Sequence, residues 1–480
     1  MKTRKARGLL SAVGCLVMVA TAATAACDGD DAVSPASDAS PSEAATLERD
    51  AGVADADAAA PELTKEEEAI IKTLGPLPAV PADKTNAFAD VAAAATLGQM
   101  LFFEKSYSGP IVVADDGTNG GLGALGATGK VSCASCHGGE ALEDARSKPN
   151  NTSIGIDRGT RNALALVNAA YYPWTNWGGR FDSQWSLAPA VAENPRNMAS
   201  SRLAVAHMLW TKYRTEYNAV FPVPLDAALD PAAADAARFP ATGKPKAAVT
   251  DPDGPWELMA AADRTIVNTI VANYGKAIAA YERKLVSGGS ALDRFVGGDA
   301  NALSADARRG LKVFIGKGKC VSCHSGPTLS DGKFHALLVP QTGVGVPAAD
   351  LGRFTDVPPL LASPFNTNGA FSDDKTTGKL TGLAQDATQQ GQFRTPTLRN
   401  IAKSGPYMHA GQLATLDAVV AFYATGGGTA GDAGDAGVVK DPALLPLTLV
   451  GTDAADLVAF MKALTGAAIP VDLLRDTAKP

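Results

Sequence analysis

Hydrophobic side chains recur with the spacing of amphipathic helices in four stretches of the chain: residues 86–105, 263–285, 303–318 and 455–466. The third stretch contains Ser304 near its start, a residue type that caps helix N-termini by accepting a backbone hydrogen bond. The alternation of apolar and polar residues that is typical of strands is scarce, and Pro- and Gly-rich loops fill much of the remainder. The pattern predicts an all-α fold with long irregular loops.

Two of these predicted helices lead into the same short motif. Residues 86–105 precede the sequence VSCASCH, and residues 303–318 precede KCVSCH. The repetition indicates an internal duplication of one small helical module. A chain of 480 residues also exceeds the roughly 250–300 residues at which single hydrophobic cores stop growing. We therefore expect two domains, residues 61–290 and residues 291–480.

The N-terminal region carries the pattern of an exported protein. Residues 1–26 combine basic residues near the start with an apolar run, as in a secretion signal. The residues before Cys27 resemble a bacterial lipoprotein cleavage site, although Thr24 stands where leucine is usual, and ordinary signal cleavage is the alternative. Residues 27–60 are rich in Ala, Asp, Ser and Pro, which predicts a disordered tether. We expect a periplasmic or cell-surface lipoprotein whose membrane contact is the lipid on Cys27.

Composition narrows the classes of partner. The formal net charge of −7 disfavours a nucleic-acid partner. The acidity would suit a small basic partner, but solubility alone is the simpler explanation. The hydrophobic fraction of 46% is enough for ordinary soluble cores.

The cysteines are concentrated at a few places. Of the six, Cys15 lies in the secretion signal and Cys27 at the predicted lipid site, and the other four occupy the two motifs. Disulfides are an alternative in an exported protein, but they do not explain a histidine directly after each pair. Structural zinc would need a second Cys or His pair near each motif, which the sequence does not supply. A redox-active Cys pair would not need the histidine either.

The Cys-X-X-Cys-His pattern is typical of covalent c-type haem. The two cysteines bond to the porphyrin and the histidine ligates the iron. The sequence therefore predicts two such haems. They are held by Cys133, Cys136 and His137 and by Cys320, Cys323 and His324. The sixth iron position takes a thioether or stays open to a ligand such as peroxide, and Met408 is a candidate thioether, although methionine more often serves packing.

Several segments resemble the bacterial di-haem cytochrome c peroxidase family, which includes the MauG-like proteins. The resemblance covers most of residues 86–465. It is carried by LGQMLFFEKSYSG, RNALALVNAAYYPWTNWGGRFDSQW, ENPRNM, GLKVFIGKGKCVSCHSGP, DGKFHALLVP, QFRTPTLRNIAKSGPYMHAG and ADLVAFMKALTG. It implies two cytochrome c-type haem domains packed together, with peroxide bound at the N-terminal haem and electrons transferred through the C-terminal haem.

The resemblance also implies roles for individual residues. Met408 would ligate the second haem iron opposite His324, which makes that haem the electron entry point. Trp177 would bridge the two haems, and its alternative role is that of a core aromatic residue. A calcium ion would lie between the domains, or the residues that match its ligands are purely structural. These matching positions are Asn162 and the backbone carbonyls around Arg394 and Pro396.

The chain departs from the family pattern around the first haem. Ile156 stands where many members carry a histidine that caps the peroxide haem until reduction removes it. Because isoleucine cannot ligate iron, we predict a first haem with no protein sixth ligand, open without reductive activation. Leu187 and Asn197 stand where a distal Gln and Glu are usual, and asparagine does not titrate usefully.

Three further positions bear on this pocket. Glu193 lies about one helical turn before Asn197 and is either a replacement carboxylate or a surface residue. Gln184 is a candidate hydrogen-bonding group. Gly178 removes the aspartate of the usual WDGR sequence, beside Arg180.

The sequence thus predicts an exported di-haem oxidoreductase that reduces hydrogen peroxide to water with electrons from a small donor protein such as a cytochrome c. Its catalytic candidates are Trp177, Glu193 and Asn197. One alternative is a MauG-like oxidase that withdraws electrons from a partner protein or an organic substrate, which the open first haem favours. Another is a non-catalytic electron-transfer or redox-sensing protein, which Leu187 and Asn197 favour. A homodimer is left open as the oligomeric state.

Overall fold

A computed structural model describes residues 62–114, 122–144, 146–432, 434 and 437–480. The chain divides into two compact units, Met1–Asp57 and Ala58–Pro480, and all described residues belong to the second. The predicted secretion signal and tether, with Cys27, lie outside the described residues. None of the described helices combines the length and the hydropathy that a membrane span requires.

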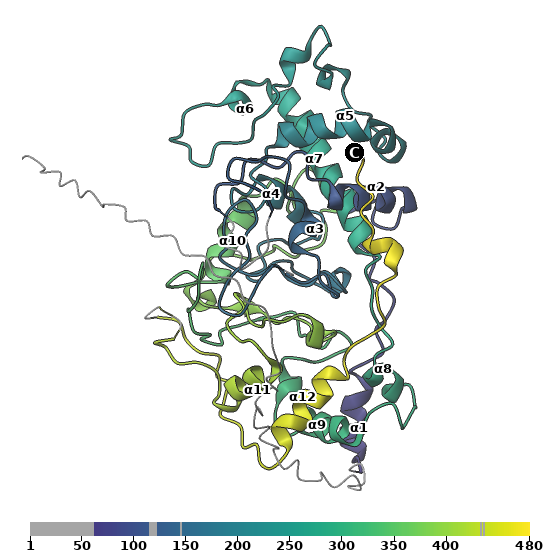
Figure 1. Ribbon diagram of the computed structural model, residues 1–480, viewed down its shortest axis with the longest axis vertical. Helices are drawn as coiled ribbons and strands as arrows, with labels where there is room; N and C mark the ends of the chain where they lie inside the picture. The colour runs from purple at the N-terminus through teal and green to yellow at the C-terminus, as the bar shows by residue number, and fades with distance from the viewer. Residues whose placement is uncertain (1–61, 115–121, 145, 433, 435–436) are drawn as a thin grey trace, which may run out of the picture. The chain divides into compact units, whose positions relative to one another are not determined.

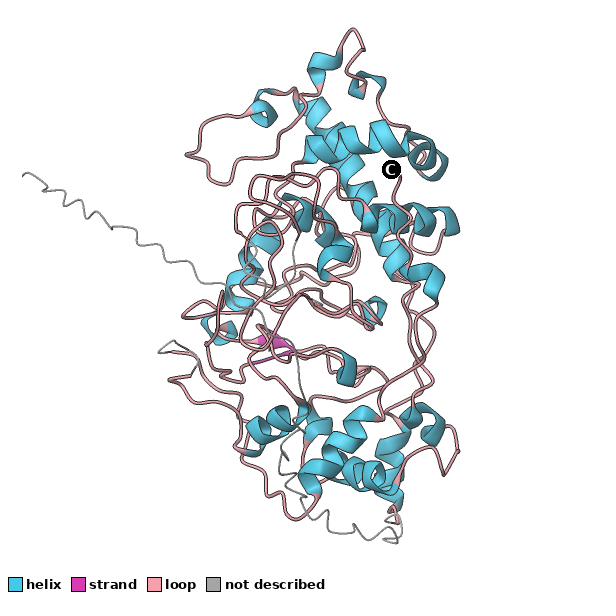
Figure 2. Ribbon diagram, in the orientation of Figure 1, coloured by secondary structure: helices cyan, strands magenta, loops and turns pink. Residues whose placement is uncertain are grey.

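The described residues form a helix-rich fold, as the sequence predicts (Figures 1 and 2). The α-helices are α1 (Lys65–Lys72), α2 (Ala92–Phe103), α3 (Cys133–Cys136), α4 (Leu187–Glu193), α5 (Arg202–Val220), α6 (Pro255–Leu258), α7 (Ala261–Glu282), α8 (Ala291–Val296), α9 (Ala305–Ile315), α10 (Arg353–Ala362), α11 (Leu416–Ala424) and α12 (Asp453–Lys462). The 3-10 helices are η1 (Ala169–Tyr171), η2 (Ala227–Leu229), η3 (Ala236–Arg238), η4 (Cys320–Ser322), η5 (Ala387–Gln389), η6 (Ile401–Lys403) and η7 (Val471–Leu474).

Strand structure within this part of the chain is limited to one antiparallel pair, drawn in magenta in Figure 2. Strand β1 (Phe334–His335) pairs with β2 (Phe393–Arg394), with Phe334 opposite Arg394. The four predicted helical stretches correspond to α2, α7, α9 and α12. Ser304 caps α9 by accepting a hydrogen bond from the backbone N–H of Ala307, as predicted.

The first hydrophobic core forms where α2 packs against α7, with α4 and α5 beside them (Figure 1). At Gly98 of α2, a Cβ atom would overlap the backbone carbonyl of Ala277 of α7. The missing side chain therefore lets the two helix backbones approach closely. The largest fully buried side chains of this core are aromatic: Trp185, Tyr213, Tyr217 and Tyr274.

The second hydrophobic core forms where α9 packs against α12, with α1 and α11 beside them (Figure 1). The rings of Phe314 and Phe460 meet at its centre with centroids 5.1 Å apart. Gly310 of α9 faces the backbone carbonyl of Asp456 of α12, so a glycine again permits the close approach of two helices.

Each end of the described chain contacts the core that lies farther from it in the sequence. Helix α1 precedes the first core in sequence but packs against α9 of the second. The C-terminal segment follows the second core but contacts the first, because Tyr281 donates a hydrogen bond to the carbonyl of Leu473 (2.5 Å) and Tyr213 accepts one from the N–H of Lys479 (3.0 Å). The division into domains at residue 290 stays a prediction.

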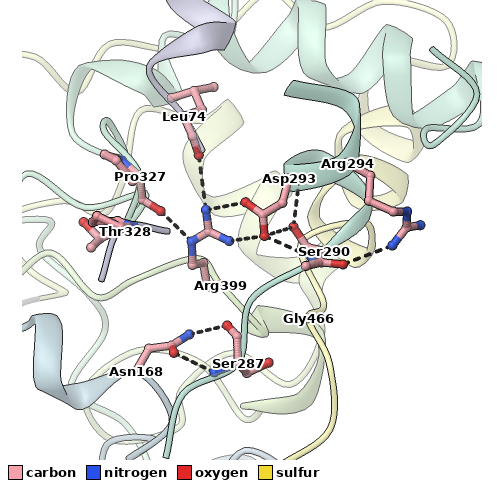
Figure 3. Close-up of polar contacts among 12 residues, drawn as sticks. Leu74, Asn168, Ser287, Ser290, Asp293, Arg294, Pro327, Thr328, Arg399 and Gly466 are labelled. Atoms are coloured by element: carbon pink, nitrogen blue, oxygen red, sulfur yellow. Dashed lines mark hydrogen bonds and ion pairs between the residues drawn. The ribbon is translucent and has the colours of Figure 1, made fainter. Parts of the chain in front are cut away.

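A buried ion pair ties several segments of the second core together (Figure 3). Arg399 donates two hydrogen bonds to Asp293, at 2.8 and 2.9 Å, and their side chains are only 2% and 4% exposed. The same guanidinium donates to the carbonyls of Leu74, at the end of α1, and of Pro327, in the loop after the second motif. Although burial opposes its ionisation, the guanidinium holds the pKa of Asp293 below its ordinary value.

Candidate functional site

The first motif is shaped by the short helix α3. Helical geometry places Cys133 and Cys136 one turn apart, and the N–H of His137 donates to the carbonyl of Cys133 (3.0 Å). The ring of His137 donates from Nδ1 to the carbonyl of Leu142 (3.0 Å). Burial lowers the pKa of His137, which favours the neutral ring. A neutral ring that donates from Nδ1 carries its lone pair on Nε2, the form that a metal ion binds.

The second motif repeats this arrangement. The N–H of His324 donates to the carbonyl of Cys320 (2.9 Å), and its Nδ1 donates to the carbonyl of Leu329 (3.0 Å). Burial lowers the pKa of His324 as well. Each histidine therefore has its ring held through Nδ1 by the carbonyl five residues later, which leaves Nε2 as the nitrogen that a metal ion would bind.

The thiols fit thioether attachment better than zinc or disulfides. The four described cysteines are all free. Burial raises the pKa of Cys133, Cys136 and Cys320 to about 12, whereas zinc binds thiolates. In the described part of the chain, the one group of three or more metal-binding side chains is Cys323, Asp331 and His335, which holds a single cysteine. Neither motif therefore forms the four-ligand corner of a structural zinc site.

A largely apolar cavity lies against the second motif. Cys320, Cys323 and His324 line it together with Met408. Its apolar lining comes from Leu337, Val339, Leu398, Val419, Val420, Leu457 and Met461. The cavity thus brings together the two cysteines and the histidine of the second motif and the predicted thioether ligand, and an apolar lining is what a porphyrin ring requires.

Met408 has an unusual backbone conformation. Its φ of 72° lies in the left-handed region, which costs non-glycine residues about 1–3 kcal/mol. Two hydrogen bonds between Tyr407 and Leu413, at 2.8 and 3.3 Å, close the turn that holds it. Strained residues of this kind cluster at ligand sites, because the surrounding structure must enforce them.

His335 also lines this cavity. Its ring lies between Asp441 (2.5 Å) and Asp331 (3.0 Å). Hydrogen bonds to Cys323 and to the two carboxylates raise the pKa of His335 to about 10. The two carboxylates therefore favour the protonated form of the ring. Asp441 lies more than a hundred residues along the chain from this histidine, so the spacing of residues in the sequence carries no signal of the cluster.

Hydrogen bonds through Asn162 connect Trp177 to His409, the residue after Met408. Its indole N–H donates to the carbonyl of Asn162 (2.8 Å), and the N–H of Asn162 donates to the carbonyl of His409 (2.8 Å). The backbone N–H of Arg394 donates to the carbonyl of Trp177 (2.7 Å). Trp177 also lines the cavity beside the second motif. The tryptophan is thus held at both its ring and its backbone, close to the predicted thioether ligand.

The residues predicted to bind calcium lie around the same cavity. Asn162, Arg394 and Pro396 all line it. The side chain of Asn162 is buried, and neither its Oδ1 nor its Nδ2 has a hydrogen-bond partner among the described residues. A buried amide without partners is costly, and an amide oxygen is a ligand that calcium accepts. The site therefore fits an oxygen-coordinated cation.

The residues predicted to shape the pocket of the first haem differ in burial and in their contacts. Ile156 is fully buried in the first core, and its N–H donates to the carbonyl of Asn197 (2.9 Å). The side chain of Asn197 is exposed. Glu193 forms an ion pair with Arg202 (2.9 Å), so its carboxylate already has a cationic partner. The structure thus brings Ile156 and Asn197 together through the backbone, and it gives Glu193 a structural contact.

The space beside Gly178 holds a carboxylate from elsewhere in the chain. A Cβ atom at Gly178 would overlap Oδ2 of Asp356, which lies in α10 and pairs with Arg161 (2.8 Å). Arg353, one turn earlier in α10, donates to the carbonyls of Gly178 (3.1 Å) and Gly179 (2.8 Å). Helix α10 therefore supplies the negative charge that the sequence lacks after Trp177, and it fixes the turn that follows this residue.

Comparisons with known proteins agree on one family. The family described as di-haem cytochrome c peroxidase matches residues 92–301. The chain is 31% identical over 399 residues to the cytochrome-c peroxidase IdrP1 of Denitromonas iodatirespirans, covering 82% of this chain and 86% of that protein. It is 33% identical over 193 residues to the methylamine utilization protein MauG of Methylorubrum extorquens, covering 39% and 42%. A crystal structure of a MauG-like protein associated with microbial copper homeostasis shares the fold, with a TM-score of 0.55 and 24% identity over 84% of this chain and 97% of that one.

Proposed function

Because the chain belongs to the di-haem cytochrome c peroxidase family, we propose that it reduces hydrogen peroxide to water with electrons from a small donor protein such as a cytochrome c. It is an oxidoreductase with two haems, as its family requires. The haems supply the binding and reduction of peroxide once they are attached. The observation that supports the proposal best is the apolar cavity that His324 and a candidate thioether, Met408, line together with two free thiols.

The second haem site is the proposed electron entry point. His324 and Met408 would hold its iron, and a His/Met ligand set gives a high reduction potential. Trp177 would carry electrons toward the first site. Its hydrogen bonds to Asn162 and from Arg394 fix its position, which electron transfer between two fixed groups requires.

The first haem site is the proposed peroxide site. Cys133, Cys136 and His137 would hold the haem, and no protein ligand is proposed for the sixth position. Ile156, at the place of the usual capping histidine, is apolar and packed into the core. It would therefore offer no ligand to the iron of an attached haem, and peroxide could bind without a reductive rearrangement.

Steady-state kinetics with the purified haem-loaded protein test this function. We expect hydrogen peroxide to oxidise a reduced small cytochrome c without prior reduction of the enzyme. Glu193→Gln is the first variant to compare, because Glu193 is a proposed acid–base group. Its ion pair with Arg202 predicts a loss of activity below tenfold, and a larger loss would assign the proton transfer to Glu193.

The same experiment separates the rival functions. A MauG-like oxidase would show no turnover of cytochrome c but a lasting change of the haem spectrum after peroxide. An electron carrier would show no spectral response to peroxide at either haem. An open first site would favour the oxidase over the carrier, since it would leave room for a small oxidant.

We also propose one calcium ion, ligated by Oδ1 of Asn162 and by backbone carbonyls around Arg394 and Pro396. The unpartnered amide of Asn162 supports this site. Elemental analysis of the purified protein should give one calcium per chain, and Asn162→Leu should abolish it. Calcium retained in Asn162→Leu would place the ion elsewhere.

Export and lipidation at Cys27 complete the proposal, with the lipid as the membrane contact. Mass spectrometry of the N-terminal peptide should detect acylated Cys27, and Cys27→Ala should release the protein from the membrane fraction. A homodimer is the proposed assembly that sedimentation would test.

A further inference from the structure

Glu282 is a buried carboxylate without a cationic partner. It is the last residue of α7 and is 5% exposed. Its Oε2 accepts a hydrogen bond from Nε2 of Gln184 (2.8 Å). Among the described residues, no lysine, arginine or histidine forms an ion pair with it. A buried carboxylate that is held by a neutral amide alone is uncommon, because burial penalises the charged form.

Glu104 is another buried carboxylate, but it has a cationic partner. Glu104 is more deeply buried, at 1% exposure, but Lys212 lies 2.8 Å from it and Tyr213 donates a hydrogen bond to it (2.6 Å). Although burial opposes this, these partners hold the pKa of Glu104 below its ordinary value. Burial has the opposite net effect at Glu282, where it raises the pKa to about 7. Glu282 is therefore able to change protonation state at neutral pH.

The position of Glu282 links it to the first haem motif. Positions 274, 278 and 282 recur every four residues along one side of α7. Burial raises the pKa of Cys133, and the nearby charge of Glu282 raises it further. The titratable groups that face Glu282 are thus Cys133 of α3 and Tyr274 and Tyr281 of its own helix. The phenols stay neutral at physiological pH because burial raises their pKa, and Cys133 loses its proton when it forms the thioether.

Tyr274 is connected through Tyr107 to Met198, a neighbour of the altered position Asn197. Its hydroxyl lies 2.5 Å from that of Tyr107, and the Tyr107 hydroxyl lies 3.6 Å from Sδ of Met198. Met198 follows Asn197, the residue that stands where the family has its distal glutamate. Gln184 lies three residues before Leu187, the other altered position. Gln184 therefore joins Glu282 to the segment that carries the altered positions.

We propose that Glu282, held by Gln184, takes up one proton when the haem on His137 gains an electron and releases it when the electron leaves. The proposal rests on the proposed function, because it assumes a haem on Cys133 and Cys136. In this step the haem takes one electron from the donor protein. The carboxylate of Glu282 takes one proton from water and becomes a carboxylic acid. Reduction of peroxide to water consumes two electrons and two protons, so Glu282 would supply a proton that Leu187 and Asn197 cannot. Glu282 is thus a proton-holding residue beside the haem.

A redox titration of the haem-loaded full-length protein between pH 5 and pH 9 tests this inference. We expect the midpoint potential of the first haem to fall as pH rises above about 7, the pKa that burial gives Glu282, with a slope that approaches one proton per electron. The carboxylate disfavours the reduced haem, which sets the sign of the change. Glu282→Gln should flatten this slope, and the matched variant Glu104→Gln, which removes another buried carboxylate, should keep it.

Gln184→Leu supplies a second readout. The hydrogen bond from Gln184 lowers the pKa of Glu282, so its loss should move the sloping region to higher pH. A wild-type potential that does not change with pH, or a slope that persists in Glu282→Gln, would overturn the proposal. The titration needs neither peroxide nor a donor protein, so it tests Glu282 even where turnover is absent.

Discussion

Replacing Asp293 by asparagine removes the negative charge from a nearly fully buried ion pair (Figure 3). The substitution keeps the size of the side chain but leaves the guanidinium of Arg399 buried without a counter-charge. Removing one partner of a buried pair costs about 3–5 kcal/mol. Asparagine still offers one carbonyl oxygen to the two N–H groups that now bind at 2.8 and 2.9 Å, so we expect a loss near the lower value, about 3 kcal/mol.

The loss should also reach the second haem site. Arg399 donates to the carbonyl of Pro327, and Leu329, two residues later, accepts the hydrogen bond from Nδ1 of His324. Loosening Arg399 therefore loosens the loop that orients His324. We expect a broader haem absorption band for the second site in Asp293→Asn, together with the loss of stability.

Guanidinium denaturation followed by circular dichroism measures the free energy of unfolding. Arg294→Gln is the matched control, because Arg294 is exposed and, among the described residues, donates only to the carbonyl of Gly289 (3.0 Å). It should change the stability by less than about 0.5 kcal/mol. A loss below about 1 kcal/mol in Asp293→Asn would refute the role assigned to the pair.

The same pair gives a pH dependence with a definite sign. The folded protein holds the pKa of Asp293 below its unfolded value. The stabilisation is therefore fully present above the unfolded pKa of about 3.9 and is lost as pH falls through the folded pKa. Asp293→Asn should lack this part of the acid dependence. An identical loss of stability on acidification in both proteins would contradict the assignment.

Three further substitutions test other parts of the structure. Ile156→His should give the first haem iron a second histidine, converting its electron paramagnetic resonance signal to a low-spin form; an unchanged signal would show that position 156 does not face the iron. Met408→Leu should lower the midpoint potential of the second haem, and an unchanged potential in spectroelectrochemistry would remove Met408 from the ligand set. Gly98→Ala should destabilise the first core by about 1–3 kcal/mol in guanidinium denaturation, because the new methyl group overlaps the carbonyl of Ala277; a neutral effect would show that the two helices move apart without cost.

The helices that carry the cores could be predicted from the sequence. Apolar spacing and the Ser304 cap are local features, and they correspond to α2, α7, α9 and α12. The crossing of the chain ends between the cores could not be predicted, because it depends on single hydrogen bonds between distant residues, such as Tyr281 and Leu473.

Some features of the candidate site could likewise be predicted from the sequence, and others could not. The haem motifs follow from local spacing alone, since a thioether pair and its histidine must be adjacent. The resemblance supplied the role expected of Asn162, and it pairs Met408, already a candidate thioether, with His324. The relocated carboxylate of Asp356 fills the space beside Gly178 from a residue far along the chain, and no periodicity links the two positions. Glu282 could not be singled out for a related reason: its last-turn position in α7 is ordinary, and only burial and the missing cation distinguish it.

Electron paramagnetic resonance of the oxidised protein as isolated reports the ligands of both haem irons at once. If Ile156 replaces the capping histidine, the first haem is open to peroxide, whereas Met408 closes the second. We therefore expect one high-spin ferric signal from the first haem and one low-spin signal from the His/Met-ligated second haem. Two low-spin signals, with one typical of iron held by two histidines, would contradict an open first haem.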